Sequence, residues 1–202
     1  MVYEPHETHY IGEGFLRVCG VDEAGRGPLA GDVYAAAVIL PARYDLTGLN
    51  DSKLLTPKRR EALFGEIQAQ AVAWAVALAT VEEIERLNIL RAALLAMRRA
   101  VEALRPPADF ALVDGNQRPP LQIPCAPLVH GDARCASIAA ASILAKVARD
   151  RAMEELDGAY PGYGFAQHKG YPTAAHYEAL ERLEPCPAHR KNFRLYYSRI
   201  KQ

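Results

Sequence analysis

The chain has 202 residues, and half of them are hydrophobic, which is enough for one well-buried core and excludes general disorder. Acidic and basic residues balance at 24 each, so the chain lacks the basic character of many nucleic-acid-binding domains. It has no apolar run long enough to span a bilayer and no signal-like N-terminus, and its four scattered cysteines lack metal-ligand spacing, so we expect a cytoplasmic protein.

Strands dominate the predicted elements of the first 80 residues. Phe15–Asp22 and Val33–Leu40 have strand-like apolar patterns. Thr56 and Pro57 are typical N-cap and first helical residues of a helix that we expect to continue to about Gln68. The run Ala71–Ala79 alternates small and larger apolar residues, which predicts a strand that is buried on both faces.

Helices and strands alternate in the rest of the chain. The sequence Thr80-Val81-Glu82-Glu83 is a capping box that opens a short helix, and Asn88 is expected to cap a longer one through Ala103. The further predicted elements are strands at Phe110–Asp114 and Ile123–Val129, helices at Ala136–Leu156 and Thr173–Leu183, a loop from Gly158 to Gly170, and a helix in the C-terminal tail. This order of elements is typical of the α/β class.

Charge is unevenly distributed along the chain. Residues 1–32 hold six acids and two bases, whereas residues 185–202 hold five bases and no acid: Arg190, Lys191, Arg194, Arg199 and Lys201. An acidic site beside a basic tail suits an enzyme that binds a polyanion. The alternative is a solvated terminal helix.

The segment Val18–Gly27 joins metal-binding and phosphate-binding chemistry. An apolar run ends in Asp22 and Glu23, and carboxylates bind hard divalent cations. Gly25-Arg26-Gly27 follows directly, and glycine allows close backbone approach while arginine pairs with phosphate. Consecutive strand residues point to opposite faces, so Asp22 and Glu23 can share one site only where the strand ends.

Two further carboxylates are candidate metal ligands. Asp114 closes the apolar run that begins at Phe110, at the carboxyl end of a predicted strand. Asp132 precedes the long alanine-rich helix. Alone, Asp114-Gly115 favours an ordinary turn, and Asp132 could be a turn or helix-capping residue. Ligands that are all oxygen favour Mg²⁺ or Mn²⁺, and the histidines have no zinc-site spacing.

Several motifs, in order along the chain, resemble those of the ribonuclease HII family. They cover about Phe15 to Phe193 and read Asp22-Glu23-Ala24-Gly25-Arg26-Gly27, Asn50-Asp51-Ser52-Lys53, Asp114-Gly115-Asn116, Gly131-Asp132, Ala139–Val147 with Arg149-Asp150, His168–Thr173, and His189-Arg190. The resemblance implies one ribonuclease H-like domain over residues 1–202. Its core, about 15–157, would be a five-stranded mixed sheet flanked by helices, and a C-terminal helical extension would follow at about 158–202.

The resemblance also assigns roles to residues. Asp22, Glu23, Asp114 and Asp132 fall on the four metal-binding, catalytic acids of the family. Gly25-Arg26-Gly27 would read the ribose 2′-hydroxyl, and Tyr171 would pack on the deoxyribose that follows it. Lys53 and the Ser52 hydroxyl, before a predicted helix, are expected to bind a backbone phosphate. Lys146, which shares one helix face with Ser142, is a further candidate substrate-binding residue. The alternatives are a glycine turn, an ordinary packed tyrosine and surface lysines.

The implied activity is an endonuclease that cleaves the RNA strand of RNA–DNA hybrids and nicks 5′ of single ribonucleotides in duplex DNA. Two Mg²⁺ or Mn²⁺ ions would serve it, the products would carry 5′-phosphate and 3′-hydroxyl ends, and the enzyme would act as a monomer. His130 and Asn192 stand where the family commonly has lysine and serine. The alternatives are ribonuclease HIII, disfavoured because only about fourteen residues precede the first strand, a catalytically inactive binding module, and a small-molecule phosphatase.

Overall fold

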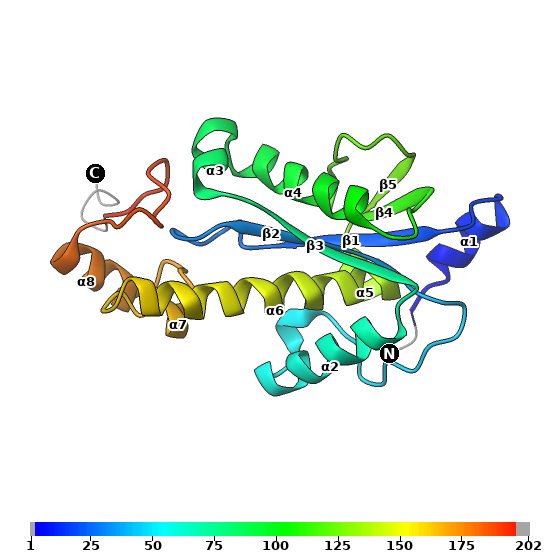
Figure 1. Ribbon diagram of the computed structural model, residues 1–202, viewed down its shortest axis with the longest axis horizontal. Coiled ribbons are helices and arrows are strands. Elements are labelled where there is room, and N and C mark those ends of the chain that lie inside the picture. Colours follow the sequence, from blue (N-terminus) through cyan, green and yellow to red (C-terminus); the bar gives the residue numbers. More distant parts are fainter. Residues whose placement is uncertain (1–2, 197–202) are drawn as a thin grey trace.

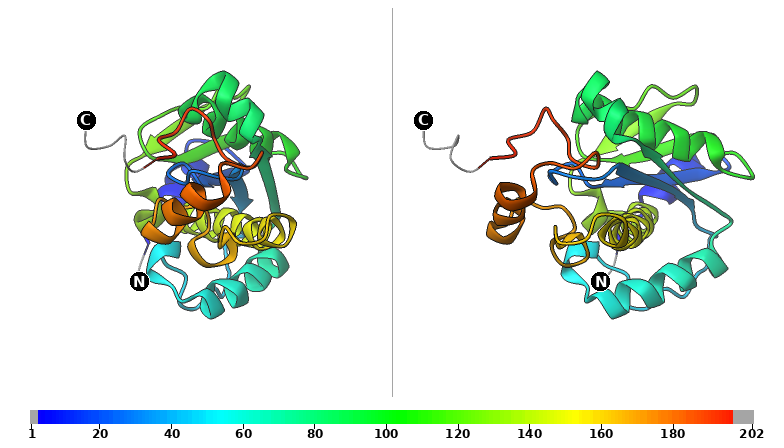
Figure 2. Two further views of the ribbon diagram at one scale, coloured as in Figure 1. Left: turned by 90° about the vertical axis from the view of Figure 1, so that its left-hand side faces the viewer. Right: turned by 60° about the vertical axis from the view of Figure 1, so that its left-hand side comes forward.

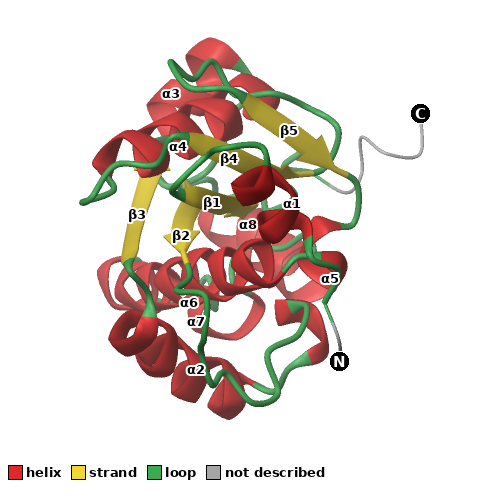
Figure 3. Ribbon diagram, turned by 90° about the vertical axis from the view of Figure 1, so that its right-hand side faces the viewer, coloured by secondary structure: helices red, strands yellow, loops and turns green. Residues whose placement is uncertain are grey.

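A mixed five-stranded sheet forms the centre of the computed structural model, which describes residues 3–196 (Figure 3). Its order is β3-β2-β1-β4-β5, with β1, β2 and β3 antiparallel and β4 and β5 parallel to β1. The strands are β1 (Val18–Ala24), β2 (Val33–Ile39), β3 (Ala73–Ala79), β4 (Phe110–Asp114) and β5 (Cys125–Leu128). The α/β class and the five-stranded mixed sheet are therefore confirmed.

Helices cover both faces of this sheet (Figure 1). On one face lie α3 (Val81–Leu87) and α4 (Ile89–Ala103), and on the other lies α6 (Ala136–Ala159), with α2 (Pro57–Gln70) packed against its outer side. Gly20 permits the close approach of α6 to β1, because a side chain there would overlap the backbone of Ser137 and Ile138. This tight contact lies directly before the acidic end of β1.

Local sequence signals determine most of the helix starts. The side chains of Thr56 and Asn88 accept hydrogen bonds from the backbone N–H groups three residues later. Thr80 forms both halves of the expected capping box with Glu83. Thr173 caps α8 (Ala174–Leu183) in the same way as Thr56. Each cap satisfies backbone donors that the helix itself leaves unpaired, so these starts could be predicted from sequence.

Some boundaries differ from the prediction. β1 begins at Val18 rather than Phe15, because the Asp109 carboxylate accepts the N–H groups of Leu16 and Arg17. The strand also continues through Ala24, beyond the predicted end at Asp22. Four short elements were not predicted: α1 (His6–Gly12), the 3₁₀ turn η1 (Ser52–Leu54), α5 (Gly131–Arg134) and α7 (Phe165–His168).

The C-terminal part of the chain packs against the loop between β1 and β2 (Figure 2). α7 and α8 form an apolar cluster with Leu29 and Ala30, and the backbone of Ala188 to Arg190 pairs with that of Leu29 to Gly31. The predicted tail helix is wrong as far as the structure describes it, because residues 184–196 contain no helix. The remainder of that prediction lies outside the described residues. None of the described helices has the length and apolar character needed to cross a membrane.

Candidate active site

Asp22 and Asp114 are brought together by the register of two parallel strands. Gly20 pairs with Leu112 in the β1–β4 ladder, and the two aspartates each lie two residues further along their strands. Side chains two residues apart share a face of a strand, so both carboxylates point toward the α5 and α6 side. The parallel pairing of β1 with β4 and its register therefore bring together residues 92 positions apart in sequence.

Asp132, on α5, is the third carboxylate of this group. The backbone N–H of Gly131 donates a 2.7 Å hydrogen bond to Oδ1 of Asp114, which joins the start of α5 to the end of β4. One oxygen from each of Asp22, Asp114 and Asp132 then lies within 4.8 Å of the others. His130, the departure before this motif, adopts a left-handed conformation with φ of 55° directly before α5.

Glu23 does not belong to this group of three carboxylates. β1 is still regular at this position, so the side chain points to the α4 face, where it lines a small cleft with Asp114, Asn116 and Leu90. Its Oε1 lies 3.2 Å from Nη1 of Arg26. Three of the four expected carboxylates therefore converge, and the metal-binding roles of all four stay predictions.

The carboxylates raise one another's proton affinity. Burial, followed by the charges of Glu23 and Asp114, raises the pKa of Asp22 well above its ordinary value. Burial and the charge of Asp132 raise the pKa of Asp114. Burial also raises the pKa of Glu23, although the Arg26 guanidinium opposes this shift. Crowded carboxylates of this kind favour a cation between them.

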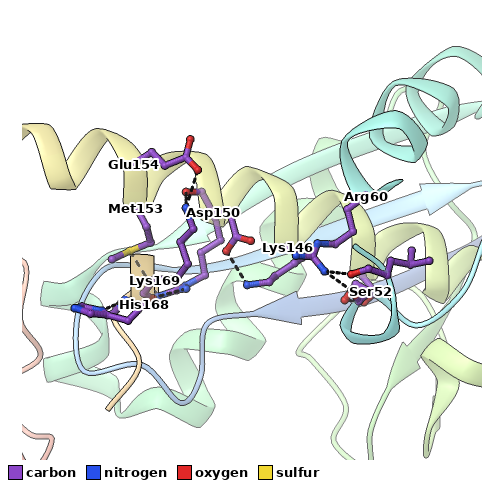
Figure 4. A network of polar contacts seen from close by, with 12 residues as sticks. Ser52, Arg60, Lys146, Asp150, Met153, Glu154, His168 and Lys169 are labelled. Atoms are coloured by element: carbon purple, nitrogen blue, oxygen red, sulfur yellow. Dashed lines mark hydrogen bonds and ion pairs between the residues drawn. The ribbon is translucent and has the colours of Figure 1, made fainter. Parts of the chain in front are cut away.

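Lys53 and Ser52 lie beside the acids on the turn η1. Nζ of Lys53 is 3.2 Å from Oδ2 of Asp132, and this carboxylate raises the pKa of Lys53 even though partial burial opposes the shift. The Ser52 hydroxyl is buried and bonds to the hydroxyl of Ser142 at 2.7 Å. Arg60 holds the turn through the carbonyls of Ser52 and Leu55 (Figure 4).

Lys146 lies on α6 between this turn and the C-terminal segment. Its ammonium forms a 2.7 Å ion pair with Asp150 one turn further along the helix (Figure 4). It is also 5.9 Å from the centre of the Tyr171 ring. Partial burial lowers the pKa of Lys146, with Asp150 opposing the shift. Lys53 thus contacts the acidic group, whereas Lys146 lies near Tyr171.

The loop Gly25-Arg26-Gly27, which follows the acids of β1, contacts Tyr171. A methyl group on Gly27 would lie 3.7 Å from Cε1 of the Tyr171 ring, so the two surfaces are in direct contact. Gly25 has a φ of 102°, and a side chain there would also overlap the buried Arg149 guanidinium. Tyr171 keeps 41% of its surface exposed, so part of this side chain is accessible to a ligand.

Two functional candidates were misjudged or missed from sequence. Arg190 was expected to bind phosphate from a basic tail, but its side chain is fully buried and bonds to backbone carbonyls of residues 25–32. Arg149 is also buried and bonds to carbonyls of Ala30 and Lys169. Arg149 and Arg190 both belong to motifs of the ribonuclease HII family, and this membership is the sequence signal that could have marked them as important. Asn192, the second departure, donates to the carbonyl of Glu85.

Buried and half-buried carboxylate oxygens from two sheet strands and a short helix fit a hard divalent cation. Together with a mixed five-stranded sheet in the order 3-2-1-4-5, this site defines a metal-dependent nuclease of the ribonuclease H class.

Comparison with known proteins identifies the family within that class. The sequence profile of ribonuclease HII matches residues 19–200. The chain is 63% identical over 179 residues to ribonuclease HII of Laribacter hongkongensis, covering 88% of this chain and 90% of that protein. It is 61% identical over 176 residues to the Dechloromonas aromatica enzyme, covering 87% and 90%. The chain belongs to the ribonuclease HII family and is a nuclease that hydrolyses phosphodiester bonds in RNA-containing nucleic acid.

Solved structures support the same fold. Ribonuclease H2 from Pyrococcus horikoshii superposes with a TM-score of 0.74 at 28% identity, over 91% of this chain and 96% of that one. A ribonuclease HIII solved with Mn²⁺ has the same TM-score at 20% identity, over 92% and 70%, and shows the likeness of fold alone. Family membership decides between the two types in favour of ribonuclease HII, and against the inactive module and the small-molecule phosphatase.

Proposed function

We propose that this enzyme nicks duplex DNA on the 5′ side of single embedded ribonucleotides, besides cleaving the RNA strand of RNA–DNA hybrids. The observation that carries the proposal is the contact between the Gly25–Gly27 loop and Tyr171 beside the acids. A junction between ribose and deoxyribose needs one reader for each sugar. Backbone groups of the loop suit a 2′-hydroxyl, and the exposed part of the Tyr171 side chain suits a sugar without one.

The acidic group supports a reaction with two bound Mg²⁺ or Mn²⁺ ions. Asp22, Asp114 and Asp132 would hold these cations, with Glu23 as a further ligand from the adjoining cleft. When bound, the ions supply an activated water, neutralise the phosphate and stabilise the leaving oxygen. Hydrolysis of the phosphodiester bond by this two-metal mechanism would leave a 5′-phosphate and a 3′-hydroxyl.

The protein's own groups orient this site. The Gly131 N–H fixes the Asp114 carboxylate, and the Glu23 N–H donates to Oδ1 of Asp22 at 2.7 Å. Lys53 lies 3.2 Å from Asp132 and has an exposed side chain, so it can exchange this carboxylate for a substrate phosphate when cations neutralise the acid. Lys146 lies close enough to Tyr171 to contact the phosphate of a strand that packs on the ring. Because all of these groups come from one chain, we propose that the monomer is the active unit.

The test uses an end-labelled duplex with one embedded ribonucleotide and an otherwise identical all-DNA duplex. We expect a single cut at the 5′ side of the ribonucleotide in Mg²⁺ or Mn²⁺, with a 3′-hydroxyl on the upstream fragment, and no cut in the control. An RNA–DNA hybrid is cleaved in parallel as a positive control for the family activity. Cleavage of the hybrid without any cut at the embedded ribonucleotide would reject the proposed junction activity.

A further inference from the structure

The Arg190 guanidinium is buried beneath the loop that carries Gly25-Arg26-Gly27. It donates to the carbonyls of Gly25 at 2.7 Å, of Pro28 at 2.8 Å and of Gly31 at 2.6 and 2.8 Å. Longer contacts of 3.3 Å reach the carbonyls of Arg26 and Asp32. One guanidinium therefore donates hydrogen bonds to five carbonyls within the eight residues 25–32.

These contacts also determine where the neighbouring N–H groups point. In a trans peptide the carbonyl of one residue and the N–H of the next point in opposite directions. Since the carbonyls of Gly25 and Arg26 point inward to Arg190, the N–H groups of Arg26 and Gly27 point outward. Neither N–H donates a hydrogen bond to any residue between 3 and 196. Two unpaired donors thus face the surface beside Tyr171.

We propose that Arg190 is a positioning residue for ribose recognition, which aims the N–H groups of Arg26 and Gly27 at the 2′-oxygen of the substrate. A hydroxyl oxygen has two lone pairs and can accept both hydrogen bonds. The inference rests on the proposed junction activity, because it assigns the atoms that read the ribose. It also replaces the expectation that Arg190 itself binds phosphate.

Arg149 supports the loop from the neighbouring side. Its guanidinium lies under Gly25, where a side chain would overlap it, and donates to the carbonyl of Ala30 at 3.2 Å. Neither Arg149 nor Arg190 forms an ion pair with a carboxylate within the described residues. Burial, with the charge of Arg149, lowers the pKa of Arg190 to about 9, so the group still carries its charge at neutral pH.

The arrangement of carbonyls around residue 190 requires the planar guanidinium of arginine. A lysine at position 190 would retain the charge but has one ammonium with three donors, which cannot reach carbonyls spread around a planar guanidinium. The peptide groups at residues 25–27 would then be free to turn. Arg182 offers a matched control, because it too donates to a backbone carbonyl, that of Gly162 at 2.9 Å, in the same C-terminal region.

The first measurement compares the affinities of Arg190→Lys, Arg182→Lys and the wild type for two duplexes. One duplex carries a single ribonucleotide and the other is all DNA, and both are titrated in EDTA so that neither is cut. The ratio of the two dissociation constants does not depend on the folded fraction. Two hydrogen bonds to the 2′-oxygen predict a wild-type preference that falls at least about fivefold in Arg190→Lys and is unchanged in Arg182→Lys.

An unchanged ratio in Arg190→Lys, even with weaker binding overall, would overturn the proposal and leave Arg190 a purely structural residue. An equal fall of both affinities that grows smaller as salt is raised would point to a phosphate contact instead, and it would overturn the proposal as well. Cleavage of the ribonucleotide duplex by the wild type is scored separately in Mg²⁺, so failure of the proposed function is recognised independently.

The second measurement needs no variant and covers the case in which Arg190→Lys does not fold. Amide hydrogen exchange of the wild type is followed at Arg26 and Gly27, free and with each duplex. We expect both amides to exchange quickly in the free protein and to gain protection with the ribonucleotide duplex only. Slow exchange in the free protein, or equal protection by both duplexes, overturns the proposal.

Discussion

Replacement of Asp114 by asparagine is expected to inactivate the enzyme and, without metal, to stabilise it. The carboxylate oxygens of Asp22, Asp114 and Asp132 lie within 4.8 Å of one another. At that separation two unit charges repel by about 1 kcal/mol in water and by about 3 kcal/mol at an effective dielectric constant near 20. Asparagine removes two of these three repulsions but keeps an oxygen that can accept the Gly131 N–H.

The pH dependence of this stabilisation has a definite sign. The folded protein raises the pKa of Asp114 above its ordinary value, through burial and the Asp132 charge. The folded state therefore binds a proton more tightly than the unfolded state, so the wild type loses stability as pH rises through the raised pKa. We expect Asp114→Asn to gain at least about 2 kcal/mol at pH 8, or roughly 4 °C or more in melting temperature, and less at pH 5.

The assay is thermal denaturation in EDTA at pH 5 and pH 8, repeated with Mg²⁺, beside cleavage of an RNA–DNA hybrid. Mg²⁺ should stabilise the wild type much more than the variant, because the variant has lost a ligand. Asp109→Asn is the matched control, since Asp109 also accepts backbone N–H groups but stands outside the acidic group. If Asp114→Asn melts no higher than the wild type in EDTA at pH 8, the carboxylates do not repel as the geometry requires.

Metal dependence, the tyrosine, a buried histidine and the basic tail each allow a further test. Activity lost in EDTA should return with Mg²⁺ or Mn²⁺, and restoration by Zn²⁺ alone would contradict the argument from oxygen ligands. Tyr171→Ala should lose most cleavage at a single embedded ribonucleotide and less on an RNA–DNA hybrid, whereas Tyr171→Phe should keep its junction preference; equal losses on both substrates would make the tyrosine structural. Burial lowers the pKa of His176 to about 4, so this histidine alone should lower the unfolding free energy by about 2–3 kcal/mol between pH 7.5 and pH 4.5, as the unfolded state gains protons; this contribution is the difference between the pH dependences of the wild type and His176→Asn, and identical pH dependences would refute it. The exposed Lys191 and Arg194 side chains should raise affinity through salt-sensitive phosphate contacts; their replacement by glutamine should raise KM and flatten its salt dependence, and no change in either would mark them as merely solvated.

Elements with a local cause could be predicted from the sequence almost to the residue. β4 matches its prediction at both ends, and α4 begins after the Asn88 cap and ends at Ala103. Hydrophobic periodicity and a capping side chain both act within a few residues, so they are visible in the chain itself. The short helices α5 and α7 have no side-chain cap and only four residues each, and no local signal marks them.

Residues that depend on contacts between distant segments could only partly be predicted. The acids were identified because their motifs follow one another in the family order, but the separation of Glu23 from the other three depends on where β1 stops. Arg190 was grouped with four other basic residues because a charge count does not register burial. Its partner Gly31 lies 159 positions away, and only the pairing of the two backbone segments reveals the contact.

The burial of Arg190 and Arg149 also has a consequence for how the two halves of the site are coupled. Arg190 holds the loop at Gly25, and Arg149 donates to the carbonyl of Lys169, two residues before Tyr171. The Leu29 N–H donates to the carbonyl of Gly170 at 2.8 Å, which ties the same loop to the tyrosine segment. The two proposed sugar-binding elements are therefore anchored to the same pair of buried arginines rather than to separate surface loops. A shift of the loop strains hydrogen bonds that also hold the Tyr171 segment, so the fold fixes the spacing between them, as the proposed recognition of a junction between two adjacent sugars requires.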